Sequence, residues 1–176
     1  MKFTETSIPG AFLVETEPSC DERGSFGRVF SAREFYDYGL PSDLTEVSIS
    51  SNLHRGTLRG LHFQRPPHGE TKLVRAVRGA VFDVIVDLRR ESLTFCKWFG
   101  CELSCENGRA LFVPSGCAHG FLTLTDGADV LYHITDTYEP SAVAGFAWDD
   151  PSFGIEWPIP PVVMSEKDKS WSPFER

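Results

Sequence analysis

The sequence predicts an all-β fold of two packed sheets, either a sandwich or a jelly roll. Apolar segments of strand length recur between turn residues, at 73–77, 80–88, 97–105, 109–114, 119–124 and 129–137. Asn107-Gly108 and Asp126-Gly127 separate successive segments, and such dipeptides are strong signals of hairpin turns. Many short strands with little helix are typical of these two architectures.

One segment carries a convincing helix signal. Residues 32–38 follow Ser31, a favoured N-cap, and Glu34 stands at the matching position of a capping box. Toward its end the chain becomes irregular, and the prolines at 158, 160 and 161 exclude a central strand. We therefore expect a short peripheral helix, and a tail that lies over the surface or across the mouth of a pocket.

Composition restricts the class of protein. With 176 residues, 41% of them hydrophobic, the chain suits one well-buried domain spanning residues 1–176. It shows no signal peptide and no apolar run long enough to cross a membrane. Its five cysteines form no CxxC pair, which favours reduced thiols in a cytoplasmic protein. A net charge of −8 argues against nucleic acid as a partner.

One segment differs from the rest of the chain in charge. Residues 54–78 carry six basic side chains and one acidic side chain, a local net charge of +5. The basic residues are Arg55, Arg59, Arg65, Lys72, Arg75 and Arg78. A short basic segment in an acidic protein suits a small anionic ligand better than a polyanion. For Arg65, Arg75 and Arg78 the alternative stays open that they lie on a solvated strand face.

Two spacings narrow the fold to a cupin, the double-stranded β-helix form of the jelly roll. The second cupin motif is reproduced, as far as its histidine, by Gly108, Pro114, Gly116 and His119. The opening of the first motif is matched by Gly56 and His62. The glycines and the proline of the second motif make the turns that bring His119 into the barrel.

The same motifs depart from the pattern of a metal-binding cupin. Gln64 stands where such a cupin has its second histidine, and Thr123 stands where it has an asparagine. Amide and hydroxyl oxygens replace imidazole poorly on a transition metal, so we expect no metal and no other cofactor. A weak site formed by His62, Glu70 and His119, as in a metal-dependent cupin oxygenase, stays an alternative.

Ordered motifs along almost the whole chain carry a family resemblance. They lie at residues 21–26, 56–64, 72, 113–114, 116–121, 132, 135–136, 138, 148–151, 154–158 and 165–168. In these positions the chain resembles the nucleotide-sugar 3,5-epimerases of the cupin superfamily. The resemblance implies an isomerase that inverts C3, C5 or both in a nucleoside-diphosphate 4-keto-6-deoxy sugar, a hexose or a heptose, in the biosynthesis of deoxysugars and polysaccharides.

Such an epimerisation requires three kinds of side chain. The C4 carbonyl acidifies the hydrogens on C3 and C5, so a base removes one on one face and an acid returns a proton on the other. His62 is the expected base, with the Asp168 carboxylate on its Nδ1 as the resemblance implies. Lys72 is expected beside the enolate oxygen, and Tyr132 is expected to be the acid on the opposite face.

Further residues are expected to bind the substrate. Arg23 and Arg59 suit the diphosphate, because the guanidinium fork matches phosphate oxygens. The resemblance places Phe26 at the nucleotide. The remaining residues that we expect at the substrate are Glu46, Gln64, His119 and Tyr138. His119 has a second interpretation as a structural residue, because Asp83 lies in an apolar strand and needs a partner, either His119 or His62.

Departures from the family pattern affect the expected specificity. Arg28 and Val143 stand where the family usually has glutamates, His133 where it has a lysine, and Glu46 where it has a glutamine. A carboxylate accepts two donors from guanine and one from cytosine. These departures favour guanosine diphosphate, then cytidine diphosphate, over thymidine diphosphate, unless both Arg28 and Glu46 face solvent.

The alternatives to a 3,5-epimerase are of three kinds. Within the family they are an epimerase of a single carbon and a ketoisomerase. Outside it they are the metal-dependent oxygenase and a sugar-binding cupin without catalysis, which would not need His62, Lys72, Tyr132 and Asp168 together. The resemblance also implies a homodimer, in which the N-terminal segment with Arg23 and Phe26 reaches the partner's pocket and covers a strand edge.

Overall fold

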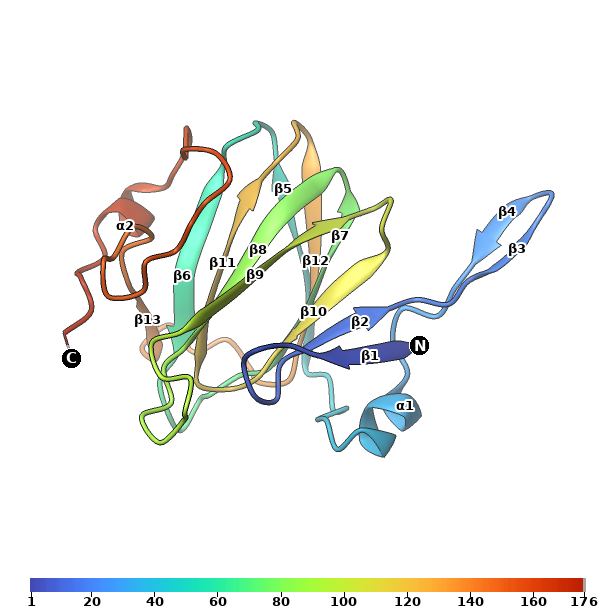
Figure 1. Ribbon diagram of the computed structural model, residues 1–176, viewed down its shortest axis with the longest axis horizontal. Helices are drawn as coiled ribbons and strands as arrows, with labels where there is room; N and C mark the ends of the chain where they lie inside the picture. Colours follow the sequence, from blue (N-terminus) through green and yellow to red (C-terminus); the bar gives the residue numbers. More distant parts are fainter. Residues whose placement is uncertain (176) are drawn as a thin grey trace.

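The computed structural model describes residues 1–175, which form thirteen strands and two short helices (Figure 1). The strands are β1 (Lys2–Glu5), β2 (Phe12–Glu15), β3 (Ser19–Asp21), β4 (Gly24–Phe26), β5 (Glu46–Asn52), β6 (Leu58–Gln64), β7 (Lys72–Arg78), β8 (Ala80–Asp87), β9 (Trp98–Ser104), β10 (Arg109–Val113), β11 (Cys117–Thr123), β12 (Ala128–Ile134) and β13 (Val143–Gly145). The helices are α1 (Ala32–Asp37) and α2 (Glu166–Lys169).

Two antiparallel sheets make the body of the molecule. One has six strands in the order β1-β2-β10-β7-β12-β5, and the other has five in the order β13-β6-β11-β8-β9. The chain passes repeatedly from one sheet to the other, so neighbours in sequence such as β6 and β7 belong to different sheets. This arrangement confirms the all-β double-sheet prediction, and each of the six segments expected as strands is a strand.

Strands β3 and β4 stand apart from both sheets. They form a two-stranded hairpin that projects away from the body of the molecule (Figure 1). Every residue of the two strands is exposed. Within residues 1–175 the hairpin therefore buries none of its residues against the two sheets.

On two strands, the residues that face the core and the residues that line a pocket lie on the same face. Val74 and Ala76 on β7 belong to the core between the sheets, and Lys72 lies on the same face because side chains alternate with a period of two. On β12 the same alternation takes Val130 into the core and carries Tyr132 to the pocket. The strand register that buries Val74, Ala76 and Val130 in the core therefore also directs Lys72 and Tyr132 into the pocket.

The first helix begins where the sequence predicts. Ser31 caps α1 by accepting a hydrogen bond from the Glu34 backbone N–H at 3.4 Å. The capping box is incomplete, because the Glu34 carboxylate binds the N-terminal amine and Arg28 instead of the Ser31 backbone. Within residues 1–175 no helix is long and apolar enough to cross a membrane. The cysteines of this part of the chain form no disulfide.

The C-terminal tail lies along β6, as its prolines indicated. Thr57 forms a parallel bridge with Val163, and the Leu58 N–H donates to the Val163 carbonyl at 2.9 Å. The short helix α2 follows and packs beside β6 (Figure 1). Near the end of the tail, the Asp150 carboxylate accepts a hydrogen bond from the Phe174 N–H. The tail is therefore attached to the body before and after α2.

A buried carboxylate at the end of β8 makes the stability of the fold depend on pH. Burial alone would raise the pKa of Asp87, but hydrogen bonds from Arg89, Ser92 and Thr94 outweigh it and lower this pKa to about 2. Arg89 donates from Nε and Nη2, each at 2.8 Å. Because the folded-state pKa lies below the unfolded one, Asp87 stabilises the fold above about pH 4 and loses this effect as the pH falls toward 2.

We expect Asp87→Asn to reduce the free energy of unfolding at pH 7 by about 2 kcal/mol, the equivalent of this pKa shift. The variant should also lose less stability than the wild type between pH 4 and pH 2, because it has no carboxyl to protonate. Urea denaturation at several pH values measures both effects, and the exposed Asp43→Asn is the matched control. Parallel stability curves for wild type and Asp87→Asn would contradict the assignment.

Candidate active site

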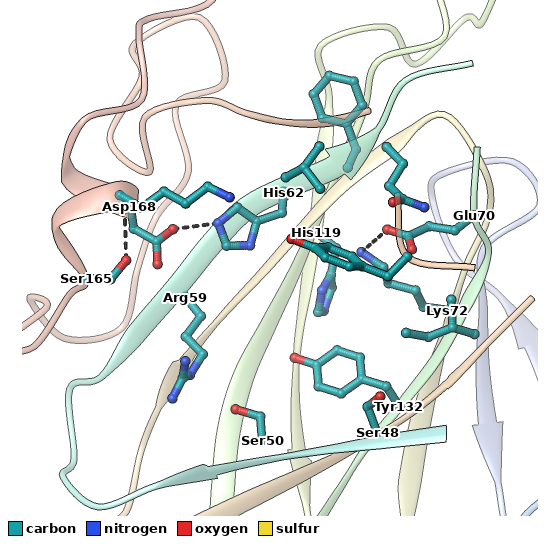
Figure 2. A pocket seen from close by; sticks show the side chains of 16 residues that line it. Ser48, Ser50, Arg59, His62, Glu70, Lys72, His119, Tyr132, Ser165 and Asp168 are labelled. Carbon is teal, nitrogen blue, oxygen red and sulfur yellow. Dashed lines mark hydrogen bonds and ion pairs between the residues drawn. The ribbon is translucent and has the colours of Figure 1, made fainter. Parts of the chain in front are cut away.

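A pocket of about 420 Å³ lies between the two sheets, with α2 at its rim (Figure 2). The six-stranded sheet contributes Ser48, Ser50, Lys72, Tyr132 and Ile134. The five-stranded sheet contributes Arg59, His62, Phe63, Gln64, His119 and Val143. The loops and the tail contribute Glu70, Tyr138, Ser165, Lys167 and Asp168. All four expected catalytic residues therefore line one pocket.

His62 and Asp168 form the shortest polar contact in the pocket wall. His62 Nε2 lies 2.5 Å from Asp168 Oδ1. The Asp168 side chain is buried, whereas that of His62 is partly open to the pocket. The contact differs in one respect from the expectation, which placed the carboxylate on Nδ1. With Nε2 held by Asp168, Nδ1 is the ring nitrogen left to act on a ligand.

The environment keeps Asp168 ionised. Burial alone would raise its pKa, but the hydrogen bond and charge of His62 outweigh burial, with smaller contributions from Ser165 and Trp171, so the pKa lies below its ordinary value. Ser165 also caps α2 by accepting from the Asp168 N–H at 3.0 Å. The N-cap that starts the helix thus fixes the backbone that carries the carboxylate.

Two histidines lie side by side where β6 and β11 pair. His62 stands opposite His119 in the register, and the register shifts between His119 and Phe121. The two backbones approach closely here, since a Cβ on Gly60 would lie 2.6 Å from the Gly120 Cα. Gly60 also has a φ of +119°, which favours glycine.

His119 is the partner of the buried Asp83. Its Nε2 lies 2.9 Å from Asp83 Oδ1, and Asp83 has no solvent exposure. Of the two partners considered for Asp83, the structure has His119 and not His62. His119 lines the pocket as well, so it combines the structural position with the expected place at the substrate.

Tyr132 faces the pocket from the sheet opposite His62 (Figure 2). Its ring packs edge-on against His119, with 5.9 Å between the ring centroids. Burial, with the negative charge of Asp83, raises the pKa of Tyr132 well above its ordinary value, and Arg59 opposes this only in part. The phenol therefore keeps its proton at neutral pH and can serve as a donor.

Lys72 is paired with an acidic residue that was not expected to act at the substrate. Its Nζ lies 2.8 Å from Glu70 Oε1, and both side chains are almost buried in the pocket wall. Arg59 also lines the pocket, and its Nε donates to Asn52 Oδ1 at 2.8 Å. The two cations are thus held in place by neighbours before any ligand arrives.

Two of the expected substrate-binding residues have other tasks in the structure. Gln64 lines the pocket, but its amide accepts from the Glu139 N–H and donates to the His68 and Thr137 carbonyls. Glu46 is not among the pocket residues, and its Oε1 accepts from the Tyr138 N–H at 3.1 Å. Both side chains hold the backbone of the loop that places Tyr138 at the pocket rim.

Arg23 and Phe26 do not reach this pocket. They lie on the β3–β4 hairpin, where Arg23 pairs with Asp21 and Phe26 is 85% exposed. Several pocket residues were missed by the sequence reasoning: Ser48, Ser50, Phe63, Ile134, Ser165 and Lys167. The serines of β5 could have been found from their alternation with Val47 and Ile49, which point the other way and are exposed.

The histidines and carboxylates of the pocket are the side chains that could bind a metal ion. Among the described residues, no three His, Cys, Asp or Glu side chains gather closely enough to hold a metal ion. Both pocket histidines are bound to carboxylates, His62 to Asp168 and His119 to Asp83. The donors are thus arranged as two pairs and not as a ligand set.

The fold and the pocket together define the class of protein. It is a cupin whose jelly roll holds a His–Asp pair opposite a protonated tyrosine, an arrangement suited to moving protons. A family model described as dTDP-4-dehydrorhamnose 3,5-epimerase matches residues 5–176. The chain belongs to this epimerase family.

Individual relatives agree with this assignment. A dTDP-4-dehydrorhamnose 3,5-epimerase of Methanothermobacter thermautotrophicus is 47% identical, over 98% of this chain and 94% of the relative. The crystal structure of the Bacillus anthracis enzyme with TDP and PPi bound has a TM-score of 0.95 and 37% identity, and covers 98% of this chain and 99% of its own. The structure of the Legionella pneumophila enzyme in complex with dTDP-4-keto-L-rhamnose has a TM-score of 0.92 and 36% identity. The match covers 98% of this chain and 92% of the Legionella pneumophila chain.

Proposed function

We propose that this protein is an epimerase that inverts C3 and C5 of a nucleoside-diphosphate 4-keto-6-deoxy sugar. The observation that carries the proposal is the His62–Asp168 pair on one wall of the pocket, with Tyr132 on the other. A sugar ring between them meets a base on one face and an acid on the other, as epimerisation requires. The chain acts as one cupin domain over residues 1–176, in the cytoplasm.

The base is His62, acting through Nδ1. The C4 carbonyl of the sugar acidifies the hydrogens on C3 and C5, and the imidazole takes one of them. The imidazolium that forms is stabilised by the Asp168 carboxylate at 2.5 Å, which also holds the ring in one orientation. The lowered pKa of Asp168 keeps this carboxylate charged while the imidazole cycles.

The acid is Tyr132, and Lys72 supports the intermediate. Removal of the C–H proton places negative charge on O4, and the Lys72 ammonium supplies an N–H donor to it. Tyr132 then gives its phenolic proton to carbon from the opposite face, and the configuration inverts. The high pKa of Tyr132 keeps the proton in place until the enolate, a strong base, accepts it.

The diphosphate is bound by cations on the same side as α2. Arg59 and Lys167 both line the pocket, and neither forms an ion pair with a described carboxylate. The Bacillus anthracis relative was solved with TDP and PPi bound, which supports a site of this kind. Arg23 joins them when the hairpin of a partner subunit reaches the pocket.

The nucleotide that we propose is thymidine diphosphate, contrary to the preference for guanosine expected from Arg28 and Glu46. The Arg28 guanidinium pairs with Glu34 on α1, and Glu46 accepts from the Tyr138 backbone. Neither side chain is among the residues that line the pocket, so neither lies where a guanine edge in this pocket would be read. The relatives compared above are named for thymidine diphosphate sugars.

A homodimer completes the proposal. The outer face of the six-stranded sheet exposes apolar side chains on three positions, Val47, Ile49 and Val77. The same face holds Arg75 and His133, whose buried Nε and Nδ1 atoms have no hydrogen-bond partner among the described residues. Packing against a second copy covers this apolar face and gives the projecting hairpin a surface to rest on.

The test of proton transfer compares two variants. His62→Asn should lower solvent deuterium uptake into the substrate at least about a hundredfold, because it removes the general base. Tyr132→Phe should still allow proton abstraction but stall its return, so that deuterium appears at C3 or C5 without inversion. Nucleotide affinity should survive in both. The exposed His54→Asn is the control, and normal exchange in His62→Asn would exclude His62 as the base.

For the nucleotide, calorimetric dissociation constants of thymidine, guanosine and cytidine diphosphates provide the measurement. We expect thymidine diphosphate to bind most tightly, and Glu46→Gln to keep the same order because Glu46 contacts only protein. Tightest binding of guanosine diphosphate, lost in Glu46→Gln, would restore the specificity indicated by the sequence.

The dimer is tested by light scattering. For a chain of 19.7 kDa we expect a mass of about 39 kDa. Ile49→Arg should give the monomer mass and weaken nucleotide binding, because it places a charge in the apolar face and removes the partner's hairpin. Leu93→Arg, at a fully exposed position, is the control that should stay dimeric. A monomer mass for the wild type would refute this part of the proposal.

A further inference from the structure

Trp171 lies behind the catalytic pair without lining the pocket. Its ring packs edge-on against the His62 ring, with centroids 6.0 Å apart and an interplanar angle of 66°. It is not among the residues of the pocket wall, so it does not meet a ligand directly. Any influence of Trp171 on the reaction must therefore pass through its neighbours.

The indole also faces the carboxylate of the pair. Its Nε1 is buried and forms no hydrogen bond with the described residues. The indole N–H is nevertheless one of the groups that lower the pKa of Asp168, after His62 and Ser165. A buried N–H without a hydrogen-bond partner is costly, so the position of the indole has to be maintained by its other contacts. Asp168 is thus bound by His62, and the indole lies beside this pair.

The position of the indole is determined by a glycine on β13. Gly145 stands opposite His62 in the β13–β6 register. A Cβ on Gly145 would lie 2.5 Å from the Trp171 Cε2 and 2.5 Å from the Leu61 carbonyl oxygen. The indole therefore rests directly on the backbone beside His62, and only glycine leaves room for it.

Trp171 also contacts a cation of the pocket. Lys167 Nζ lies 5.5 Å from the centroid of the Trp171 ring, a cation–π distance. Lys167 lines the pocket beside Asp168. One side chain thus contacts both the proposed base and a proposed diphosphate ligand. Beyond it the tail is attached through Phe174, which packs among Phe95, Phe146 and Phe153.

We propose that Trp171 is a positioning residue for the reaction: it packs against the His62 ring, so that this ring stays in place against the Asp168 carboxylate, and it places Lys167 at the pocket. The expected changes in kcat and KM rest on the proposed function. The expected position of the His62 ring and of Lys167 rests on the geometry described above. A carboxylate on a four-residue helix at the end of a chain has little support from the helix itself. The indole supplies that support from the side, by contact with β6 and β13.

The kinetic test compares Trp171→Phe, which keeps a ring but removes the N–H, with Trp171→Ala, which removes both. We expect kcat to fall about tenfold in the first and about a hundredfold in the second, as misplaced catalytic groups do. Affinity for thymidine diphosphate should stay within about twofold in Trp171→Phe, since a phenyl ring still supports Lys167. The acidic limb of the kcat/KM profile should move to higher pH, because Asp168 loses a donor that lowers its pKa.

Two further variants separate positioning from general stability. Trp157→Phe is the matched control, because it removes an indole N–H that donates to the Trp148 carbonyl elsewhere in the fold. Gly145→Ala should reproduce the defect of the Trp171 variants by displacing an unchanged indole. Two results would overturn the proposal. The first is that Trp171→Phe and Trp157→Phe, at equal Tm, lose the same activity and leave the pH profile unchanged. The second is that Trp171→Ala has wild-type kinetics.

A readout independent of activity tests the geometry. The Trp171 emission, obtained as the difference between wild type and Trp171→Phe, should change when the ring in contact with the indole is removed in His62→Asn. The same substitution at the exposed His54 should leave this emission unchanged. If the enzyme proves not to be an epimerase, this signal remains and only the proposed function fails. An emission difference that does not depend on His62 would refute the positioning contact itself.

Discussion

The contact between His62 and Asp168 is the constraint on which the rest of the site depends. It joins β6, in the middle of a sheet, to α2 near the end of the chain, across 106 positions in sequence. A buried carboxylate must be paired, so the tail can occupy its place only when Asp168 meets the imidazole. The Ser165 cap, the bridge at Val163 and the anchor at Phe174 all serve to deliver this one side chain. The tail is therefore part of the pocket wall.

The opposite wall depends on strand register. Val130 is in the core and Tyr132 faces the pocket because both lie on one face of β12. A slip of one residue would turn Tyr132 outward and bring His133 in its place, and it would also expose the apolar core positions. The interactions that stabilise the sandwich thus also select which side chain faces the pocket. Along this strand, a change that alters the register would alter both the stability of the fold and the composition of the pocket.

Sequence reasoning succeeded where local signals agree with the fold. The strands between 73 and 137 have apolar cores and Gly-containing turns, and the cupin spacings place His62 and His119 correctly. It missed β3 and β4, which are three residues long and wholly exposed, and β5, whose apolar residues point outward while its serines face the pocket. The tasks of Gln64 and Glu46 could not be foreseen, because their partners are backbone groups of a loop distant in sequence.

The partners of the three pocket cations indicate how their tasks are divided. Arg59 is held by the neutral amide of Asn52, and Lys167 by the neutral ring of Trp171, so each presents its full positive charge to a ligand. Lys72 is balanced by Glu70 at 2.8 Å. A neutral partner suits a permanent dianion such as a diphosphate, which needs net positive charge to replace its hydration. An ammonium whose charge is balanced by a neighbouring carboxylate suits an oxygen that becomes charged only during the reaction. It offers a fixed N–H donor to that oxygen, and it attracts the anionic substrate only weakly before the reaction begins. The charge pattern of the pocket is thus consistent with the proposed roles, in which Arg59 and Lys167 bind the diphosphate and Lys72 stabilises the enolate.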